Sequence, residues 1–153
     1  MEAQGGLLDR LHVRGANEPD ILLDCREFKD PNLDKSILNH TGYHCRIVTQ
    51  TVKHAKFEHA ITEAVKEVKL HGKKSNDTFR ILCVCTSGVH RLVSFAIVLD
   101  YVLKKIGLET TIRHMSAGSW KPRNLCKTCP CCDDNNEIKI AACEKAYRMC
   151  KGV

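Results

Sequence analysis

The chain has 153 residues and a mass of 17.2 kDa, which is enough for one domain with its own core but not for two catalytic domains. Hydrophobic residues at 43% and charged residues at 27% exclude a wholly disordered chain. The net charge of +6 suits an anionic partner without requiring one. The sequence contains neither an apolar run of about 18 residues nor a signal-peptide pattern, so we expect a cytoplasmic or nuclear protein without a membrane partner.

The first third of the chain predicts short strands and a long connection. Residues 11–14 and the apolar run 21–25 are typical of strands, and the second strand would place Asp24 and Arg26 at its carboxyl end. Residues 26–53 show no clear periodicity and predict an irregular connection. Connections of this length tend to carry function.

Helices and strands alternate in the middle of the chain. Apolar residues at helical spacing predict a helix over 57–72, and the run 79–85 predicts a buried strand. A second helix is expected from about residue 89 to Gly107, followed by a third strand over 109–114. Parallel strands need crossover helices, so this order predicts an α/β fold with a largely parallel sheet sandwiched by helices.

We expect two regions along the chain. Residues 1–115 would form the α/β domain, and residues 116–153 would form a basic, cysteine-rich tail that ends in a helix. The sequence leaves open whether copies of the chain associate as a homo-oligomer.

The turn at residues 85–91 lies where α/β proteins hold ligands, between the end of a strand and the start of a helix. Gly88 allows close backbone approach, the hydroxyls of Thr86 and Ser87 can donate, and Arg91 can bind phosphate or carboxylate oxygens. An anion pocket is the favoured interpretation. The alternative is an ordinary helix start with Ser87 as its N-cap. His90 would donate to the anion or cap a strand end.

The turn CTSGVHR, together with Asp24-Cys25-Arg26, Asp30-Pro31 and Thr41-Gly42, resembles the C-terminal domain of the RNase adapter protein RapZ family over about residues 10–115. Ser87, Leu92 and Asp30 depart from the family pattern. The resemblance implies an isolated module, without the family's P-loop domain, that binds structured small RNA and holds a phosphorylated sugar or a similar anion. The residues that it places at the anion are Asp24, Arg26, Thr86, Ser87, Gly88, His90 and Arg91.

A second interpretation uses the same turn for catalysis. Cys85, Gly88 and Arg91 match the C-x-x-G-x-x-R loop of cysteine-dependent phosphatases, in which a thiolate attacks phosphorus and the arginine holds its oxygens. Asp24 or Asp30 would have to act as the general acid. Leu92 stands where these enzymes have Ser or Thr, so binding without turnover is favoured.

Two stretches without acidic residues, between Asp34 and Glu58 and between Glu109 and Asp133, suit contact with an RNA backbone. Trp120 is a candidate stacking platform for a base. The alternative is a pair of solvated loops. The candidate RNA-binding residues are Arg113, Trp120, Lys121, Arg123 and Lys127.

Six of the ten cysteines lie between residues 126 and 150, and their C-x-x-C spacing is typical of zinc sites. The expected ligands are Cys126, Cys129, Cys132 and Cys143, with Cys131 or Cys150 as substitutes for a late ligand. Two alternatives remain. The late cysteines could form the apolar face of a helix, or the cysteines could form disulfides.

Overall fold

A computed structural model describes residues 19–28, 35–72 and 78–153. The strand expected over 11–14 and the Asp30-Pro31 step lie outside these residues. In chain order the elements are β1 (Ile21–Asp24), η1 (Cys25–Glu27), η2 (Lys35–Ile37), α2 (Cys45–Lys53), α3 (Phe57–Gly72), β2 (Ile81–Val84), α4 (Arg91–Lys105), η3 (Ala117–Ser119) and α5 (Glu137–Met149).

β1 and β2 form a two-stranded parallel sheet in which Ile21 pairs with Ile81 and Asp24 pairs with Val84. α2 and α3 make the crossover that parallel strands require. The predicted α/β class is therefore confirmed. Because the two strands run in the same direction, η1 and the turn after β2 emerge at the same edge of the sheet.

The third strand predicted over 109–114 is wrong, because this segment is extended but belongs to neither strand of the described sheet. Its apolar Ile112 packs instead against a small buried cluster formed by Val89, Val93, Ile97 and Trp120. The alternating pattern thus reflects half-buried residues that alternate with exposed ones along this segment.

The irregular connection predicted over 26–53 is also partly wrong, because its last residues form α2. His44 caps this helix by accepting the Arg46 amide at Nδ1 (3.2 Å). Ile47, Val48 and Val52 lie on its buried face. The helical spacing of these residues was present in the sequence, but Thr, Gln and Lys between them obscured it.

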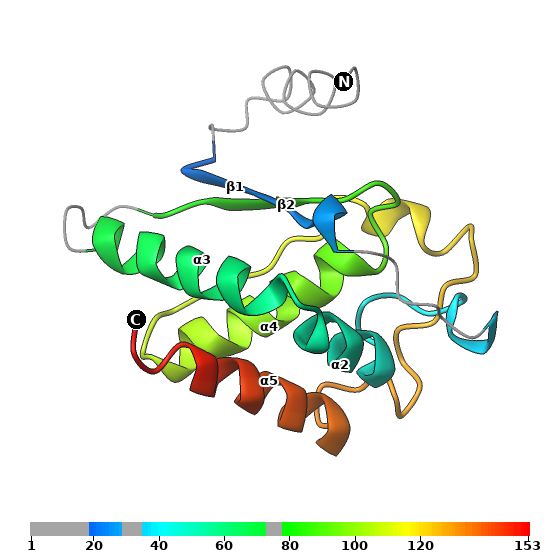
Figure 1. Ribbon diagram of the computed structural model, residues 1–153. Helices are drawn as coiled ribbons and strands as arrows, with labels where there is room; N and C mark the ends of the chain where they lie inside the picture. The colour runs from blue at the N-terminus through cyan, green and yellow to red at the C-terminus, as the bar shows by residue number, and fades with distance from the viewer. Residues whose placement is uncertain (1–18, 29–34, 73–77) are drawn as a thin grey trace.

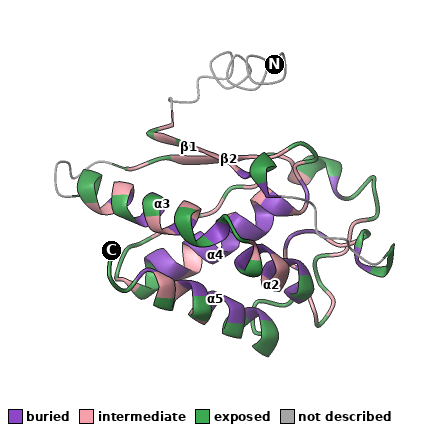
Figure 2. Cartoon of the chain, viewed as in Figure 1, coloured by how far each residue is buried: buried purple, intermediate pink, exposed green. Residues whose placement is uncertain are grey.

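The described helices lie on one side of the sheet, with α4 between the strands and α5 (Figure 1). Figure 2 shows buried residues concentrated along α4 and on the facing sides of its neighbours. Phe95, Val98 and Val102 of α4 pack in one core with Phe57 and Val65 of α3. The aromatic rings of Phe28, Phe57 and Phe95 meet at the centre of this core.

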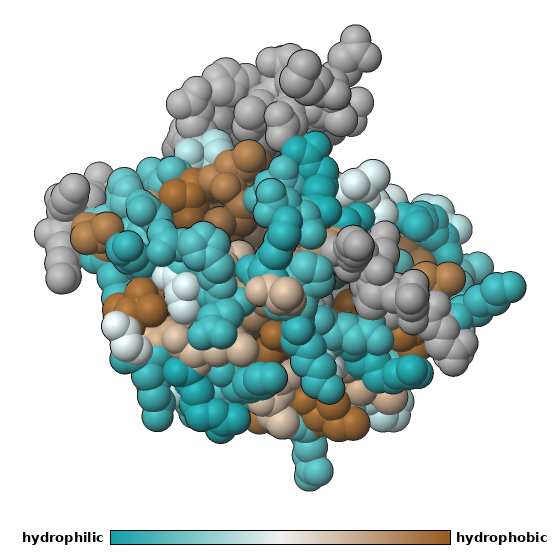
Figure 3. All heavy atoms as spheres, viewed as in Figure 1, coloured by the Kyte–Doolittle hydropathy of each residue, from teal (hydrophilic) through white to brown (hydrophobic). Residues whose placement is uncertain are grey.

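The tail helix α5 belongs to the same core. Ala142, Cys143, Ala146 and Cys150 pack against residues of α3 and α4. The face in Figure 3 is mostly hydrophilic, with an apolar area near the strands. Leu22 of β1 is 43% exposed. Across the described residues, every helix is too short or too polar to cross a bilayer.

Gly42 packs directly against the backbone at the start of α4. A Cβ atom at this position would lie 2.3 Å from the His90 carbonyl oxygen and 2.4 Å from the Ser94 nitrogen, and both are backbone atoms that cannot move aside. We expect Gly42→Ala to lower the free energy of unfolding by about 3 kcal/mol or more in urea titrations. Gly118→Ala is the control, because a Cβ there meets nothing within 4 Å. Equal stability of the two variants would contradict this packing.

Candidate metal centre and the adjoining turn

In the turn between β2 and α4, residues 86–88 form the tip and residues 89–91 form the base. The tip is the more exposed part, and hydrogen bonds to other segments hold the base. Thr86 and Ser87 are exposed, and Gly88 has a φ of 68°, a conformation that favours glycine. The Gly88 amide donates to the Cys85 sulfur at 3.3 Å, and the Ser116 hydroxyl donates to the Gly88 carbonyl. The segment that carries the basic residues of the tail therefore contacts this turn through Ser116.

Asp24 and Arg26 face each other rather than the turn. The Arg26 guanidinium donates to both carboxylate oxygens of Asp24, with Nε to Oδ1 at 2.8 Å, and the Arg26 amide adds a third bond at 3.0 Å. These bonds hold the pKa of Asp24 below its usual value. Both oxygens of Asp24 are occupied by Arg26, so its geometry does not support the role of general acid that a phosphatase would require. Asp30, the other candidate for this role, lies outside the described residues.

Arg91 is turned toward the end of β1. Its Nη1 donates to the carbonyl oxygens of Arg26 (3.1 Å) and Phe28 (2.8 Å), and the side chain is only 8% exposed. The structure thus uses this guanidinium to join α4 to η1. A phosphatase arginine would instead point at the atoms above Cys85.

His90 connects the turn to the segment 39–42. Its Nε2 donates to the His40 carbonyl oxygen at 2.8 Å, so this nitrogen is engaged within the fold. The Gly42 amide donates to the Val89 carbonyl oxygen at 2.8 Å. Of the residues expected at an anion, Thr86, Ser87 and Gly88 remain at the open tip, whereas His90 and Arg91 hold the base.

Three cysteines of the tail lie close to His40, which comes about ninety positions earlier in the chain. The Sγ atoms of Cys126, Cys129 and Cys132 and a ring nitrogen of His40 all lie within 4.8 Å of one another. His40 Nδ1 is 3.3 Å from the Cys132 sulfur and 3.7 Å from the Cys129 sulfur. Three thiols and one imidazole are a donor set that could hold a metal ion.

Three of the four expected ligands are thus brought together, and Cys143 is not. Cys143 is 2% exposed in the core between α5 and its neighbours. Burial raises the pKa of this thiol to about 12, which suits a neutral packing residue. His40 was missed as a ligand because nothing in the local sequence links it to cysteines that follow about ninety positions later.

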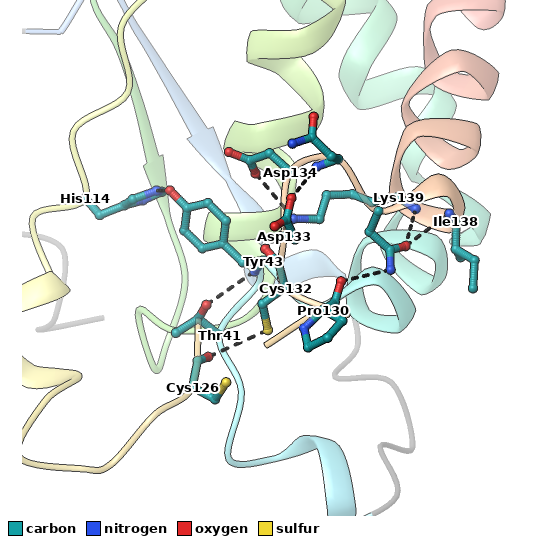
Figure 4. A network of polar contacts seen from close by, with 12 residues as sticks. Thr41, Tyr43, His114, Cys126, Pro130, Cys132, Asp133, Asp134, Ile138 and Lys139 are labelled. Carbon is teal, nitrogen blue, oxygen red and sulfur yellow. Dashed lines mark hydrogen bonds and ion pairs between the residues drawn. The ribbon is translucent and has the colours of Figure 1, made fainter. Parts of the chain in front are cut away.

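Backbone contacts hold the cysteine segment in place around this cluster. Burial alone would raise the pKa of the Cys126 thiol, but amide hydrogen bonds from Cys129 and Thr128 outweigh burial and lower it. The Cys132 carbonyl oxygen accepts from the buried ammonium of Lys139 at 2.8 Å (Figure 4). Backbone donors at the Cys126 sulfur and the contact of Lys139 with Cys132 thus hold both ends of the cysteine segment.

The basic residues expected to contact RNA are exposed, with one exception. Arg113, Lys121, Arg123 and Lys127 are all on the surface. Trp120 is only 4% exposed and packs against Tyr43 and His114, which share a hydrogen bond of 2.9 Å (Figure 4). The indole is part of the small core in this structure and does not offer a free stacking face.

Parallel strands joined by crossover helices, with a glycine turn that leads into α4, define an α/β domain whose loops gather at the carboxyl edge of its sheet. A family model described as the RapZ C-terminal domain matches residues 12–118, and the chain belongs to this family. No curated protein and no solved structure gives a match. The family match ends before Cys126, so the three cysteines of the candidate metal cluster lie beyond it.

The position of Arg91 predicts that it matters more for stability than Arg26 does. Replacing Arg91 by Met leaves two carbonyl oxygens without this donor, one of them buried, and should lower the free energy of unfolding by about 2–3 kcal/mol. Arg26→Met removes only an exposed ion pair and should leave the urea midpoint almost unchanged. A larger loss in Arg26→Met than in Arg91→Met would contradict the assignment.

Proposed function

We propose that this protein is an RNA-binding or adapter-like module that holds a phosphate-type anion at the tip of the turn 85–91. The observation that carries the proposal is the contact of Ser116, which lies within the basic segment 113–127, with Gly88 of this turn in a member of the RapZ C-terminal domain family. Four exposed cations thereby lie on a segment that touches Gly88. Phosphates of an RNA backbone could contact this segment while the turn holds a further anion.

The anion site would be smaller than the sequence alone implies. Thr86 and Ser87 have exposed side chains, and the amide groups of the turn lie at the start of α4, where the helix dipole favours negative charge. The guanidinium of Arg91 donates to carbonyl oxygens within the fold. The basic residues of the neighbouring segment would therefore supply the positive charge at the anion. A phosphorylated sugar or a terminal phosphate is the class of ligand that fits these donors.

We propose Zn²⁺ as the metal of the cluster formed by His40, Cys126, Cys129 and Cys132. Thiolate and imidazole ligands in this ratio favour zinc over the harder cations, which prefer oxygen donors. Four protein ligands leave no open position for substrate, so the ion would be structural rather than catalytic.

Salt dependence of RNA binding tests the proposed surface. We expect fluorescence anisotropy with a labelled stem–loop RNA to show affinity falling steeply as salt rises. Removing four phosphate contacts should reduce the slope of log K against log salt by about 3. The variant carries serine at Arg113, Lys121, Arg123 and Lys127.

The control for this experiment removes the same charge from other exposed positions. Serine at Lys53, Lys66, Lys145 and Arg148 should change the slope much less, because these residues lie on helices away from the turn. Equal slopes for the two variants would show that binding depends on net charge alone and would overturn the proposed surface.

A phosphatase assay tests the alternative function. Turnover of an aryl phosphate that is lost in Cys85→Ser would make the protein an enzyme.

The hydroxyls of the turn provide a second test. We expect the double variant Thr86→Ala/Ser87→Ala to bind a hexose phosphate at least about tenfold more weakly in calorimetry, because two donors to the phosphate are lost. Thr78→Ala is the control, since Thr78 is exposed and precedes the amino-terminal end of β2, which is the end away from the turn. Unchanged binding in the double variant, or equal loss in the control, would place the anion elsewhere.

A further inference from the structure

The metal cluster joins two parts of the chain that the sequence keeps far apart. His40 lies within the family match, and its Nδ1 faces the Cys132 sulfur, 92 positions later. The main chain bridges the same two segments, because Cys126 donates to the Asn39 carbonyl oxygen (2.8 Å) and Thr41 donates to the Cys126 carbonyl oxygen (3.1 Å). The cluster therefore lies at a seam between the family domain and the tail.

Two distances between candidate ligand atoms at this seam lie close to those expected around a tetrahedral ion. Zinc bonds of about 2.3 Å to sulfur and about 2.0 Å to nitrogen place neighbouring ligand atoms about 3.5–3.8 Å apart in a tetrahedron. The observed Nδ1 to Sγ distances of 3.3 and 3.7 Å lie close to this range. Cys131, between two of the ligands, is not among the four, and its carbonyl oxygen accepts from the Cys45 amide at the start of α2 (2.6 Å).

The opposite side of His40 contacts the turn. Its carbonyl oxygen accepts from His90, and two residues later Gly42 donates to Val89. Gly42 lies directly against the backbone of α4, so the segment 39–42 cannot shift without moving the base of the turn. One side of this short segment thus meets the cysteines, and the other side meets His90 and Val89.

We infer that a zinc ion held by His40 Nδ1 and the sulfurs of Cys126, Cys129 and Cys132 fastens the tail to the family domain and, through His40, fixes the base of the turn 85–91. The ligand set contains His40 in place of Cys143. The identity of the ligand that the turn binds rests on the proposed function. The attachment of the tail by zinc does not, because it requires neither RNA nor an anion.

Metal content and ligand variants test the site in the full chain. We expect one zinc per chain by mass spectrometry of the metal, and the intense visible absorption of tetrahedral thiolate-bound Co²⁺ after substitution with cobalt. His40→Ala should weaken zinc binding by about 100-fold or more, since one of four ligands is lost. His40→Cys should restore tight binding, because Cys₄ sites also hold zinc.

Cys143→Ala is the matched control and should bind zinc like the wild-type chain. Chains without zinc, wild-type affinity in His40→Ala, or loss of zinc in Cys143→Ala would each overturn the ligand assignment. Metal content and cobalt absorption of the wild-type chain do not depend on whether a variant folds.

Hydrogen exchange tests the connection to the turn. Chelation of zinc from the wild-type chain should speed amide exchange at residues 39–45 and 86–90 at least about tenfold, whereas amides within α3 should keep their protection. Unchanged exchange at residues 86–90 after zinc is removed would overturn the connection.

RNA anisotropy with and without the chelator then separates this inference from the proposed function. Faster exchange together with weaker RNA binding would support both. Faster exchange without RNA binding in either form would leave the zinc fastening standing and overturn the RNA function.

Discussion

The approach of Gly42 to the backbone at the start of α4 is the contact on which the candidate sites depend. The peptide at this position lies where a side chain would meet the His90 carbonyl oxygen and the Ser94 nitrogen. This closeness directs His40 toward the tail cysteines and brings its carbonyl oxygen to His90. It also sets α2 against α4, where Thr51 and Ser94 share a buried hydrogen bond of 2.7 Å. A single close backbone contact therefore aligns a helix, a turn and a candidate metal ligand.

The elements with strong periodicity could be predicted from the sequence, and the contacts between distant segments could not. α3, α4 and the two strands repeat apolar residues at the spacing of their secondary structure. α2 carries the same spacing in a more polar sequence, and the extended segment 109–114 has a strand pattern without a partner strand. Three cysteines of the candidate metal cluster could be predicted from the C-x-x-C spacing. His40 and the inward direction of Arg91 required the fold, because both depend on residues far away in the chain.

The ten cysteines divide by environment rather than by position in the sequence. Cys25 is buried at the end of β1, where a hydrogen bond with Cys83 and burial raise its pKa and keep the thiol neutral. Cys143 and Cys150 are likewise buried, and they fill space between α5 and the other helices. Cys126 differs because backbone amides point at its sulfur and lower its pKa. The three cysteines of the candidate metal cluster are set apart by their closeness to one another and to His40, and not by the abundance of thiols in the chain.

The bridge between Asn39 and Cys126 also bears on the order in which the chain folds. His40 and Cys132 are 92 positions apart, and closing a loop of this length costs about 4 kcal/mol of chain entropy before any contact offsets it. The crossover from β1 through α3 to β2 joins segments that are closer along the chain, and it supplies about half of the buried residues of the main core. Because contacts between distant positions cost more loop entropy, we expect the cysteine segment to dock after the crossover unit has formed.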